Sequence, residues 1–467
     1  MSVETELDLT ARRVLGAPRI AYDVSRSTYY IWTIGCQMNR ADARRAGQAL
    51  EALGYRPVPR AEDADLIILN SCVVRQSAED KVVGRLDWVR SLKKRRPGTA
   101  VVLMGCLVGD VAALQARFPH VDHFVRPSDI EGLASWVEAT LPSPLRGEGA
   151  EVRGESPTAQ PASSLLQGEG AEVSPVSAEV TAMMGCDRHC TYCLVRLRRG
   201  PGRSRTIDEI VAEAEALVRA GAKEIVLLGQ NIDAYGRDLP GRPTLAALLR
   251  RVHAIPGLLR LRFLTSHPAD LEDEVIEAVA ELPKVCPHWE LPVQAGDDEV
   301  LRRMGRGYTA AEFLALVERI RARLPGSSIA TDVIVGFPGE TSEQFERTLE
   351  LLRAARLDAV HVACYSVRPG TPAARLPDDV PPEEKERRRR AVEALQEEIV
   401  GEINARLLGQ EVEVLVEELH RGKWKGRTAT NKLVFFKDAG DWRGRLARVR
   451  ITKAGPWSLQ GEAAGET

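Results

Sequence analysis

Short apolar runs alternate with amphipathic stretches along two parts of the chain. The first part has three such runs, TYYIWTI (28–34), ADLIILN (64–70) and AVVLMG (100–105), and the second has six, near 179–184, 224–229, 259–264, 288–293, 329–335 and 359–365. Strands that alternate with helices are typical of parallel sheets with crossover helices. The pattern predicts an α/β protein, with an open parallel α/β domain over 28–140 and a partial (β/α)6 barrel over 178–403. Reactive groups of such a barrel lie at the C-terminal ends of its strands.

The remaining segments have other patterns. The tail, 404–467, alternates apolar and polar residues in EVEVLVEEL (411–419) and has Gly-bearing turns, which predicts a small closed or nearly closed β-barrel. Residues 141–177 are rich in Pro, Gly, Ser and Glu and contain a repeated decapeptide, so we predict a flexible linker or insertion there. Residues 1–27 form an N-terminal tail outside the predicted domains.

The composition is that of an ordinary globular protein. Of the 467 residues, 44% are hydrophobic and 28% are charged, and no run approaches the ~18 apolar residues of a membrane span. Acidic Glu4, Glu6 and Asp8 stand where a secretory signal would carry basic residues, so we predict a cytoplasmic protein without a membrane partner. The net charge of −2 means that any attraction to nucleic acid must come from local basic surface.

Two basic stretches qualify for such a surface. The run from Arg387 to Arg390 lies in a charged helical stretch, which favours a solvated helix face over an RNA site. The β-rich tail from residue 409 on has 11 Lys and Arg against 8 Asp and Glu, a local charge of +3. Candidate RNA contacts there are Arg421, Lys423, Trp424, Lys425 and Arg427, although an ordinary charged hairpin would show the same pattern.

Three cysteines form a compact motif directly after the first strand of the predicted barrel. Cys186, Cys190 and Cys193 have the spacing C-x3-C-x2-C. Iron–sulfur cubanes are normally held by four thiolates, so three on one loop leave one iron open to a small molecule. A structural zinc site is the alternative, but it favours paired C-x2-C units with a fourth Cys or His nearby, and His189 lies inside the loop.

A second set of cysteines is spread along the first α/β region. Cys36, Cys72 and Cys106 each follow a predicted strand by one or two residues. Because the carboxyl ends of parallel strands line one crevice, the three thiols can meet there and hold a second cluster with another open iron. Taken singly, each could be a buried inert thiol. Cys286 and Cys364 lack partners, and we expect both to be core residues.

The first motif carries a resemblance. C-x3-C-x2-C with Tyr192 before its last cysteine resembles the signature of the radical S-adenosylmethionine (SAM) superfamily. The resemblance implies that the open iron binds the amino and carboxylate groups of SAM, and that a reduced cluster passes one electron to the sulfonium and releases a 5′-deoxyadenosyl radical. Such a radical abstracts hydrogen from an unactivated carbon. Tyr192 would pack near the adenine of SAM.

Both cysteine sets in this order, followed by a small β tail, resemble the methylthiotransferase family, which has an N-terminal cluster domain, a radical SAM barrel and a TRAM domain. GCQMN (35–39) and NSCVVRQSAEDKVVGRL (70–86) are similar to the branch that acts on N6-isopentenyladenosine just 3′ of the anticodon. Further similarity runs through LLGQNIDAYG (227–236), TSHPADL (265–271), LPVQAGDDEVLRRMGRGYT (291–309), DVIVGFPGET (332–341) and YSVRPGTPAA (365–374). In these loops Gln294 and Asp332 are the expected polar contacts of the SAM pocket.

The resemblance implies two [4Fe-4S] clusters and two uses of SAM. One SAM methylates a sulfur associated with the first cluster, a second gives the radical, and the methylthio group joins C2 of the adenine at position 37 of tRNA. A stacked base hides C2, so we expect the nucleotide to be splayed out of the anticodon loop while the tail holds phosphates. The implied partners are tRNA and an electron donor such as a flavodoxin or ferredoxin, with the chain acting as a monomer.

Two alternatives stay open. The same chemistry could act on threonylcarbamoyl adenosine or on a ribosomal protein, and a non-catalytic RNA-binding protein could carry structural metal. Two departures from the family pattern bear on the substrate: the chain reads LVRLRRGPGRSR (194–205) where the family usually has a Pro-Tyr-like pair, and GCLVGD (105–110) is unusual. Both leave the six cysteines unaffected and concern the substrate contacts near Arg196 and Leu197.

Overall fold

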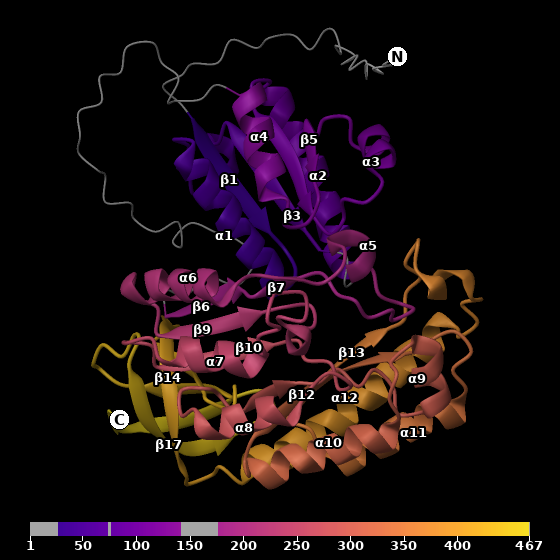
Figure 1. Ribbon diagram of the computed structural model, residues 1–467, viewed down its shortest axis with the longest axis vertical. Helices are drawn as coiled ribbons and strands as arrows, with labels where there is room; N and C mark the ends of the chain where they lie inside the picture. Colours follow the sequence, from indigo (N-terminus) through magenta and orange to yellow (C-terminus); the bar gives the residue numbers. More distant parts are fainter. Residues whose placement is uncertain (1–26, 73–75, 142–175, 467) are drawn as a thin grey trace, which may run out of the picture.

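The computed structural model describes residues 27–72, 76–141 and 176–466, which form three bodies (Figure 1). Nearly all of the predicted N-terminal tail and of the predicted linker lies outside the described residues. An α/β domain stands at one end of the molecule, a larger α/β body lies beside it, and a small β-barrel packs at the side of the larger body. In the described part, none of the helices combines the length and the apolar character needed to cross a bilayer.

Five parallel strands build the N-terminal sheet, in the order β2-β1-β3-β4-β5. They are β1 (Thr28–Thr33), β2 (Arg56–Pro57), β3 (Leu66–Ser71), β4 (Ala100–Gly105) and β5 (His123–Val125). The helices are α1 (Gln37–Ala52), α2 (Gln76–Arg95), α3 (Val111–Arg117) and α4 (Ile130–Thr140). Because α1 and α4 cover one face and α2 and α3 the other, β3 and β4 are buried along their whole length. This confirms the predicted open α/β domain.

Six parallel strands form the larger body in two sheets, β10-β9-β6 and β11-β12-β13. Their bounds are β6 (Ser177–Thr181), β9 (Glu224–Leu228), β10 (Arg260–Leu264), β11 (His288–Glu290), β12 (Ser328–Val335) and β13 (Ala359–Cys364). A parallel bridge between Leu261 and Val285, and a 3.0 Å hydrogen bond from the Ser266 N–H to the Glu290 carbonyl, join the sheets. The result is the predicted partial barrel.

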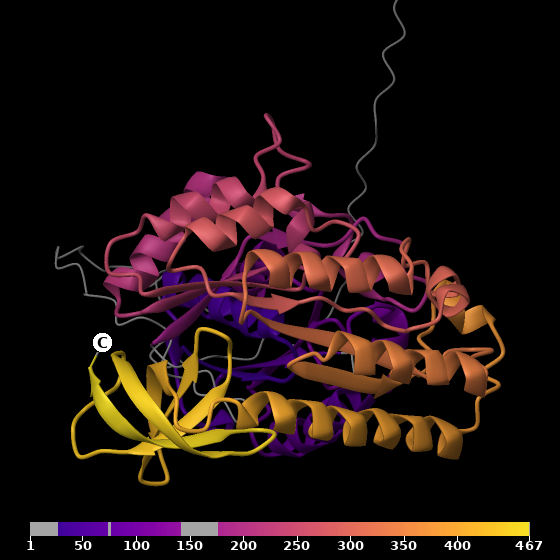
Figure 2. The same cartoon turned by 90° about the horizontal axis from the view of Figure 1, so that it is seen from below.

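Helices cover the outside of this barrel (Figure 2). They are α6 (Ile207–Arg219), α7 (Leu245–His253), α8 (Asp273–Glu281), α9 (Asp298–Met304), α10 (Ala310–Arg323), α11 (Ser342–Ala355) and α12 (Pro382–Ala405). Three of them begin at a capping box, in which a threonine hydroxyl and a Glu or Gln three residues later satisfy each other's backbone N–H groups, at Thr206, Thr309 and Thr341. Local sequence therefore fixes where these helices start.

The C-terminal strands close into a barrel in the order β14-β15-β16-β18-β17. They are β14 (Glu411–His420), β15 (Lys423–Thr428), β16 (Leu433–Lys437), β17 (Leu446–Ala454) and β18 (Leu459–Glu466). Alternating residues such as Val414, Val434 and Phe436 fill the interior, as the period of two in the sequence predicts.

The small barrel docks on the N-terminal ends of the larger barrel's strands. Arg260, the first residue of β10, donates to the carbonyl of Arg427 (2.5 Å). Arg262 donates to the carbonyls of Thr428 (2.7 Å) and Ala429 (2.8 Å). Both arginines are buried, at 3% and 5% exposure, so their charged groups depend on these carbonyls and on neighbouring acids.

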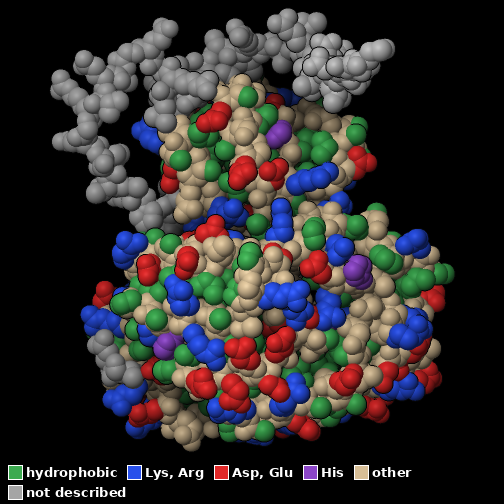
Figure 3. Space-filling view, in the orientation of Figure 1, with side chains coloured by type: hydrophobic (Ala, Val, Ile, Leu, Met, Phe, Trp, Pro, Cys, Tyr) green, Lys and Arg blue, Asp and Glu red, His purple; other side chains and the backbone are tan. Residues whose placement is uncertain are grey.

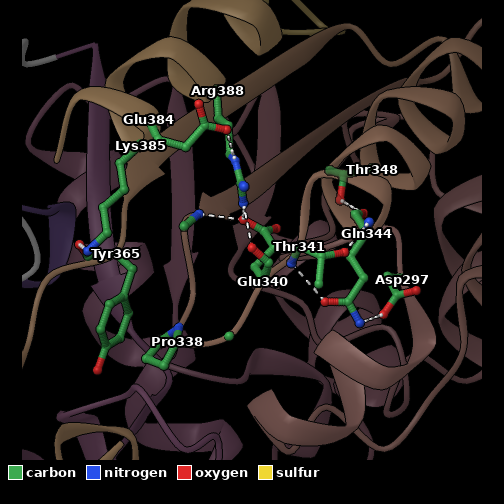
Figure 4. Close-up of polar contacts among 12 residues, drawn as sticks. Asp297, Pro338, Glu340, Thr341, Gln344, Thr348, Tyr365, Glu384, Lys385 and Arg388 are labelled. Carbon is green, nitrogen blue, oxygen red and sulfur yellow. Dashed lines mark hydrogen bonds and ion pairs between the residues drawn. The ribbon is translucent and has the colours of Figure 1, made fainter. Parts of the chain in front are cut away.

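The basic run in α12 divides between surface and core. The side chains of Arg387 and Arg390 are 60% and 74% exposed, as expected for a solvated face. Arg388 contradicts that expectation, because it is 3% exposed and donates to the Glu340 carboxylate at 2.7 Å. Figure 4 shows Arg388 between Glu384 and Glu340, whose carboxylate also accepts from the N–H of Gly336 (2.6 Å). Arg388 thus pins the loop after β12 to α12.

Candidate metal centres

The first trio, Cys36, Cys72 and Cys106, lies at the carboxyl ends of three neighbouring strands. Cys36 stands between β1 and α1, where it is the N-cap residue of the helix. Cys72 directly follows β3, and Cys106 directly follows β4. Because β3 lies between β1 and β4 in the sheet, the topology brings together three residues that are far apart in sequence.

Glycines before two of these cysteines allow the close approach. Gly35 has φ +128°, and a Cβ built on it would lie 2.3 Å from the Cβ of Cys72. Gly105 has φ +102°, and its Cβ would lie 2.4 Å from the Ser71 carbonyl oxygen. Both positions therefore exclude any side chain, which explains why Gly-Cys occurs on the strands that flank Cys72.

Two buried asparagines fix the turn that carries Cys36. Asn39 donates to the Ser71 carbonyl (2.6 Å), and Asn70 donates to the Asn39 carbonyl (2.6 Å). The Cys36 thiol lies 3.2 Å from the Asn39 side-chain oxygen. A hydrogen bond with Cys72 lowers the pKa of Cys36 to about 6, against the effect of burial, whereas burial raises the pKa of Cys106. The thiols of this trio therefore affect one another's pKa, as expected for ligands of a common metal centre.

The second trio, Cys186, Cys190 and Cys193, lies in the loop between β7 (Met183–Met184) and α5 (Val195–Arg199), near the C-terminal end of β6. Gly185 before it has φ +77°, and a Cβ there would lie 2.0 Å from the Pro201 carbonyl oxygen. Thr191 fastens the loop to the end of α9, since its N–H donates to the Met304 carbonyl at 2.9 Å. The loop is therefore held at both its start and its middle.

At the second trio a nearby positive charge favours anionic sulfur, whereas burial opposes it. Arg306 donates to the Cys190 thiol at 3.3 Å and is only 4% exposed. Burial, together with the charge of Cys190, raises the pKa of Cys193 to about 12. A positive centre is thus needed to keep these thiols ionised, and Arg306 supplies part of it.

The donor set of each trio fits a cluster better than a single ion. No three His, Cys, Asp or Glu side chains of the described ranges lie close enough to share one metal ion. In a cubane each thiolate bonds a different iron, so its ligands stand farther apart than those of one zinc. Each trio offers three thiols beside an arginine, which is the donor set that a cluster with one open iron needs.

The three expected SAM contacts lie beside the second trio or inside the barrel. Tyr192 is half-buried and packs with Phe337 and Tyr365 in one apolar cluster. Gln294 is 7% exposed, has φ +76°, and its side-chain oxygen is buried with no hydrogen-bond partner in the described part of the chain. Asp332 alternates along β12 with Val333, which packs outward against the helices, so its side chain is on the inner face. A strained, unsatisfied Gln294 is typical of a ligand contact.

A buried polar network at the mouth of the barrel was not predicted. Asp270, 4% exposed, accepts from Arg188 Nε (2.7 Å), Arg237 Nη1 (2.6 Å) and Asn231 Nδ2 (2.8 Å). Although burial acts the other way, these donors hold the pKa of Asp270 well below its usual range. Arg188 belongs to the cysteine loop, so the network anchors that loop to the ends of β9 and β10. The signal was present in the sequence, as polar residues directly after apolar runs.

Two acids of the larger barrel, the buried Asp233 and the half-buried Glu290, have raised pKa values. Burial raises the pKa of Asp233 to about 7. Burial, followed by the charge of Asp332, raises the pKa of Glu290 to about 7. Groups with such a pKa exchange protons near neutrality, and they cluster at functional sites.

Helix α1 joins the domains that carry the two trios. Its residues Met38 and Ala41 pack with Val226, Leu228 and Leu264 from the inner faces of β9 and β10. Arg44 of α1 is 3% exposed and pairs with Glu179 (3.6 Å) and Glu213 (3.5 Å) across the interface. The helix that begins at Cys36 therefore occupies part of the barrel's concave face.

The five candidate RNA contacts fall in different places. Trp424 is 8% exposed in the core of the small barrel, which corrects the expectation of a stacking contact, because a buried ring presents no face to a base. Lys425 pairs with Glu418 (2.6 Å), and Arg427 lies 3.7 Å from Glu417. Arg421 is exposed at the turn between β14 and β15, next to Lys423. On the visible face, other Lys and Arg side chains gather where the N-terminal domain meets the barrel (Figure 3).

Three family models match the chain in the order of its three bodies. Uncharacterized protein family UPF0004 matches residues 28–126, the radical SAM superfamily matches 180–352, and the TRAM domain matches 405–464. Among solved structures, the fold is similar to the radical S-adenosylmethionine methyltransferase TsrM from Kitasatospora setae, with a TM-score of 0.55 and 16% identity over 74% of each chain. At this identity the likeness supports the fold alone.

Curated relatives match nearly the whole chain. A tRNA-2-methylthio-N(6)-dimethylallyladenosine synthase from Roseiflexus sp. (strain RS-1) is 52% identical over 93% of this chain and 89% of the relative. Proteins of the same name from Herpetosiphon aurantiacus and Chloroflexus aurantiacus are each 48% identical, over 95% and 93% of this chain and 99% and 91% of theirs. The chain therefore belongs to the tRNA-2-methylthio-N(6)-dimethylallyladenosine synthase family of radical SAM enzymes.

Proposed function

We propose that the chain transfers a methylthio group to C2 of N6-isopentenyladenosine at position 37 of tRNA, using one [4Fe-4S] cluster on each cysteine trio. The observation that carries the proposal is the junction of the two sites. The first trio stands on the carboxyl ends of β1, β3 and β4, the second lies in the loop after β7, and α1 packs the N-terminal domain against the barrel. A nucleobase held between the domains can then face both trios.

At the second trio, the chain's own residues would bind and orient SAM. Gln294 offers a buried acceptor, Asp332 an anionic group on the inner face, and Tyr192 an aromatic surface beside the cysteine loop. When bound, the cluster and SAM together supply the electron and the carbon radical that removes a hydrogen atom. The Arg188–Asp270 pair keeps the loop in place, and the apolar wall around Tyr192 keeps water away.

An apolar spot supports a prenylated base as the substrate. Leu197 on α5 and Val367 after β13 are large apolar side chains that are 55% and 44% exposed. Leu197 lies against Gly370, where an added Cβ would be 3.4 Å from its Cδ1, so the two segments face each other. Burying an isopentenyl group here would be favourable, whereas the polar threonylcarbamoyl group would gain less.

The remaining partners follow from the chemistry. The clusters would have to be reduced by a small electron-transfer protein such as a flavodoxin or ferredoxin. We propose that the chain acts as a monomer, because both trios and the proposed SAM contacts belong to one chain.

Anaerobic reconstitution followed by a single incubation tests the proposal. Reconstituted protein should hold about eight irons per chain, as expected for two four-iron clusters. With SAM, a reductant and isopentenylated tRNA, it should form 5′-deoxyadenosine together with a methylthiolated base, measured by mass spectrometry of nucleosides. Bound zinc without iron, or deoxyadenosine without any modified base, would contradict the proposal. Modification of threonylcarbamoyl adenosine instead would keep the chemistry and change the substrate.

A further inference from the structure

Arg199 is the point at which the radical SAM domain reaches into the N-terminal domain. It is the last residue of α5, six positions after Cys193, and it is 7% exposed. Its Nη1 donates to the Ser128 hydroxyl at 2.6 Å, and its Nη2 donates to the Asp42 carboxylate at 2.9 Å. Ser128 in turn donates to the other oxygen of Asp42 at 2.9 Å. The guanidinium is therefore clamped in a closed network with two elements of the other domain.

The same guanidinium faces the first trio. Asp42, which it contacts, lies in the second turn of the helix that Cys36 caps, and burial raises the pKa of Cys106 while the charge of Arg199 lowers it. Asp42 acts on both thiols with the opposite sign. An arginine side chain stays protonated in proteins, so Arg199 is a permanent positive charge beside two of the three expected ligands.

Burial makes this charge effective and explains its partner. The side chains of Arg199 and Asp42 are 3% and 1% exposed, where the local dielectric is low and solvent screening is weak. An isolated buried guanidinium would be costly, and Asp42 offsets that cost. Reduction adds a negative charge to a cluster, and a fixed cation nearby favours the reduced form, since reduction potentials follow local charge and hydrogen bonds to sulfur.

We propose that Arg199 is a positioning residue that ties the loop of the second trio to the first trio and raises the reduction potential of the cluster held there. The inference rests on the proposed function, because it requires a cluster on Cys36, Cys72 and Cys106. A single side chain then links the SAM-binding loop to the electrostatics of the other site.

The test uses the full-length protein with the second trio changed to alanine, so that the first cluster alone is present. Its midpoint potential is measured by a redox titration followed by electron paramagnetic resonance. Arg199→Met should shift the potential to more negative values, and Arg199→Lys should restore most of the shift. Asp42→Asn should shift it to more positive values, because it removes a negative charge while an amide still accepts from Arg199. Arg196→Met, on the same helix but exposed, should leave it unchanged.

The opposite directions expected for the midpoint potentials of Arg199→Met and Asp42→Asn distinguish an electrostatic effect from a loss of structure. A role in packing alone would move the Met and Asn variants in the same direction or not at all, and either result overturns the inference. If Arg199→Met binds too little iron for a redox titration, Arg199→Lys and Asp42→Asn provide the test: the inference requires Asp42→Asn to shift the midpoint potential to more positive values and Arg199→Lys to stay close to the parent. If the protein with the second trio changed to alanine binds no iron, both the proposed function and the inference fail. If it binds iron but the Arg199 and Asp42 variants leave the midpoint potential unchanged, only the inference fails.

Discussion

Single glycines set the distance between the ligands of the first trio. At Gly35 a side chain would meet both a left-handed backbone conformation and the Cβ of Cys72. At Gly84, by contrast, in the exposed part of α2, a Cβ would meet nothing within 4 Å. The two positions form a matched pair for the same substitution.

We expect Gly35→Ala to reduce iron binding at the first trio and to destabilise the N-terminal domain by about 1–3 kcal/mol or more, the usual cost of a strained backbone. Gly84→Ala should leave iron content unchanged and stabilise the domain by up to about 1 kcal/mol, since alanine favours a helix. Iron analysis and thermal unfolding measure both effects. Equal iron contents in the two variants would show that the close approach at Cys72 is not needed.

A half-buried acid gives the protein a pH-dependent stability. Glu290 has a pKa of about 7 when folded, because of burial and then Asp332, against an ordinary value of 4.5. Between these values the folded state binds more protons than the unfolded state, so its stability falls as pH rises from about 4.5 to 7. The contribution is of the order of 3 kcal/mol, from 1.36 kcal/mol per pKa unit.

Glu290→Gln should therefore flatten the loss of stability between pH 5 and pH 8, since the amide stays neutral throughout. Urea unfolding of the protein without iron at both pH values measures the difference. Glu281→Gln, at an exposed site on α8, is the control and should behave like the unchanged protein. A variant that loses as much stability as the parent would rule out Glu290 as the titrating group.

At the scale of elements, α1 does two things at once. It begins at Cys36, an expected cluster ligand, and it packs against the inner faces of β9 and β10 through Met38 and Ala41. Its position therefore couples the first trio to the barrel without a hinge. A helix that is buried on more than one side is fixed by tertiary packing, because its sequence pattern does not show a single apolar stripe.

Ala41→Arg should separate the two domains, because a guanidinium does not fit in a fully buried apolar contact. Hydrogen exchange of β9 and β10 should rise, and the thermal midpoint should fall, while the small barrel keeps its protection. Gln48→Arg, exposed on the same helix, is the matched control and should change neither quantity. Unchanged exchange in Ala41→Arg would mean that α1 does not hold the domains together.

Much of the fold and of the candidate site was predictable from local patterns. The apolar runs predicted nine of the strands. The first trio was inferred from the position of its cysteines directly after three of them, since parallel strands end on one side, and the second trio from the spacing C-x3-C-x2-C. Trp424 was misassigned, although its alternation with Lys423 and Lys425 placed it on the inner face of β15. Arg388 and Arg199 could not be assigned, because their burial depends on elements distant in sequence.

At the scale of the whole molecule, the RNA-binding candidates and the cysteine trios lie at opposite ends of the larger barrel. The small barrel packs on the N-terminal strand ends of the larger barrel through Arg260 and Arg262, whereas the second trio lies near the C-terminal end of β6 and the first trio stands in the N-terminal domain. An RNA that reaches both must extend along the barrel. We therefore expect the anticodon stem, and not its loop alone, to contribute to binding.

Arg421→Ala should weaken tRNA binding. It should also make the negative slope of log K against log salt shallower by about 0.9, the value for one phosphate contact on a duplex. The measurement is fluorescence anisotropy over a range of salt concentrations. Arg302→Ala, on α9 at the other side of the molecule, is the control and should leave the slope unchanged (Figure 1). A slope unaffected by Arg421→Ala would place the RNA elsewhere.

The docking of the small barrel also bears on how the gene tolerates truncation. A premature stop codon shortly before residue 427 would delete the carbonyl groups to which Arg260 and Arg262 donate, and leave two charges of the catalytic body without these acceptors. The truncated protein would misfold and be degraded, so that the whole enzyme would be lost and not only its RNA binding. The last forty residues are in this sense part of the folding unit of the barrel.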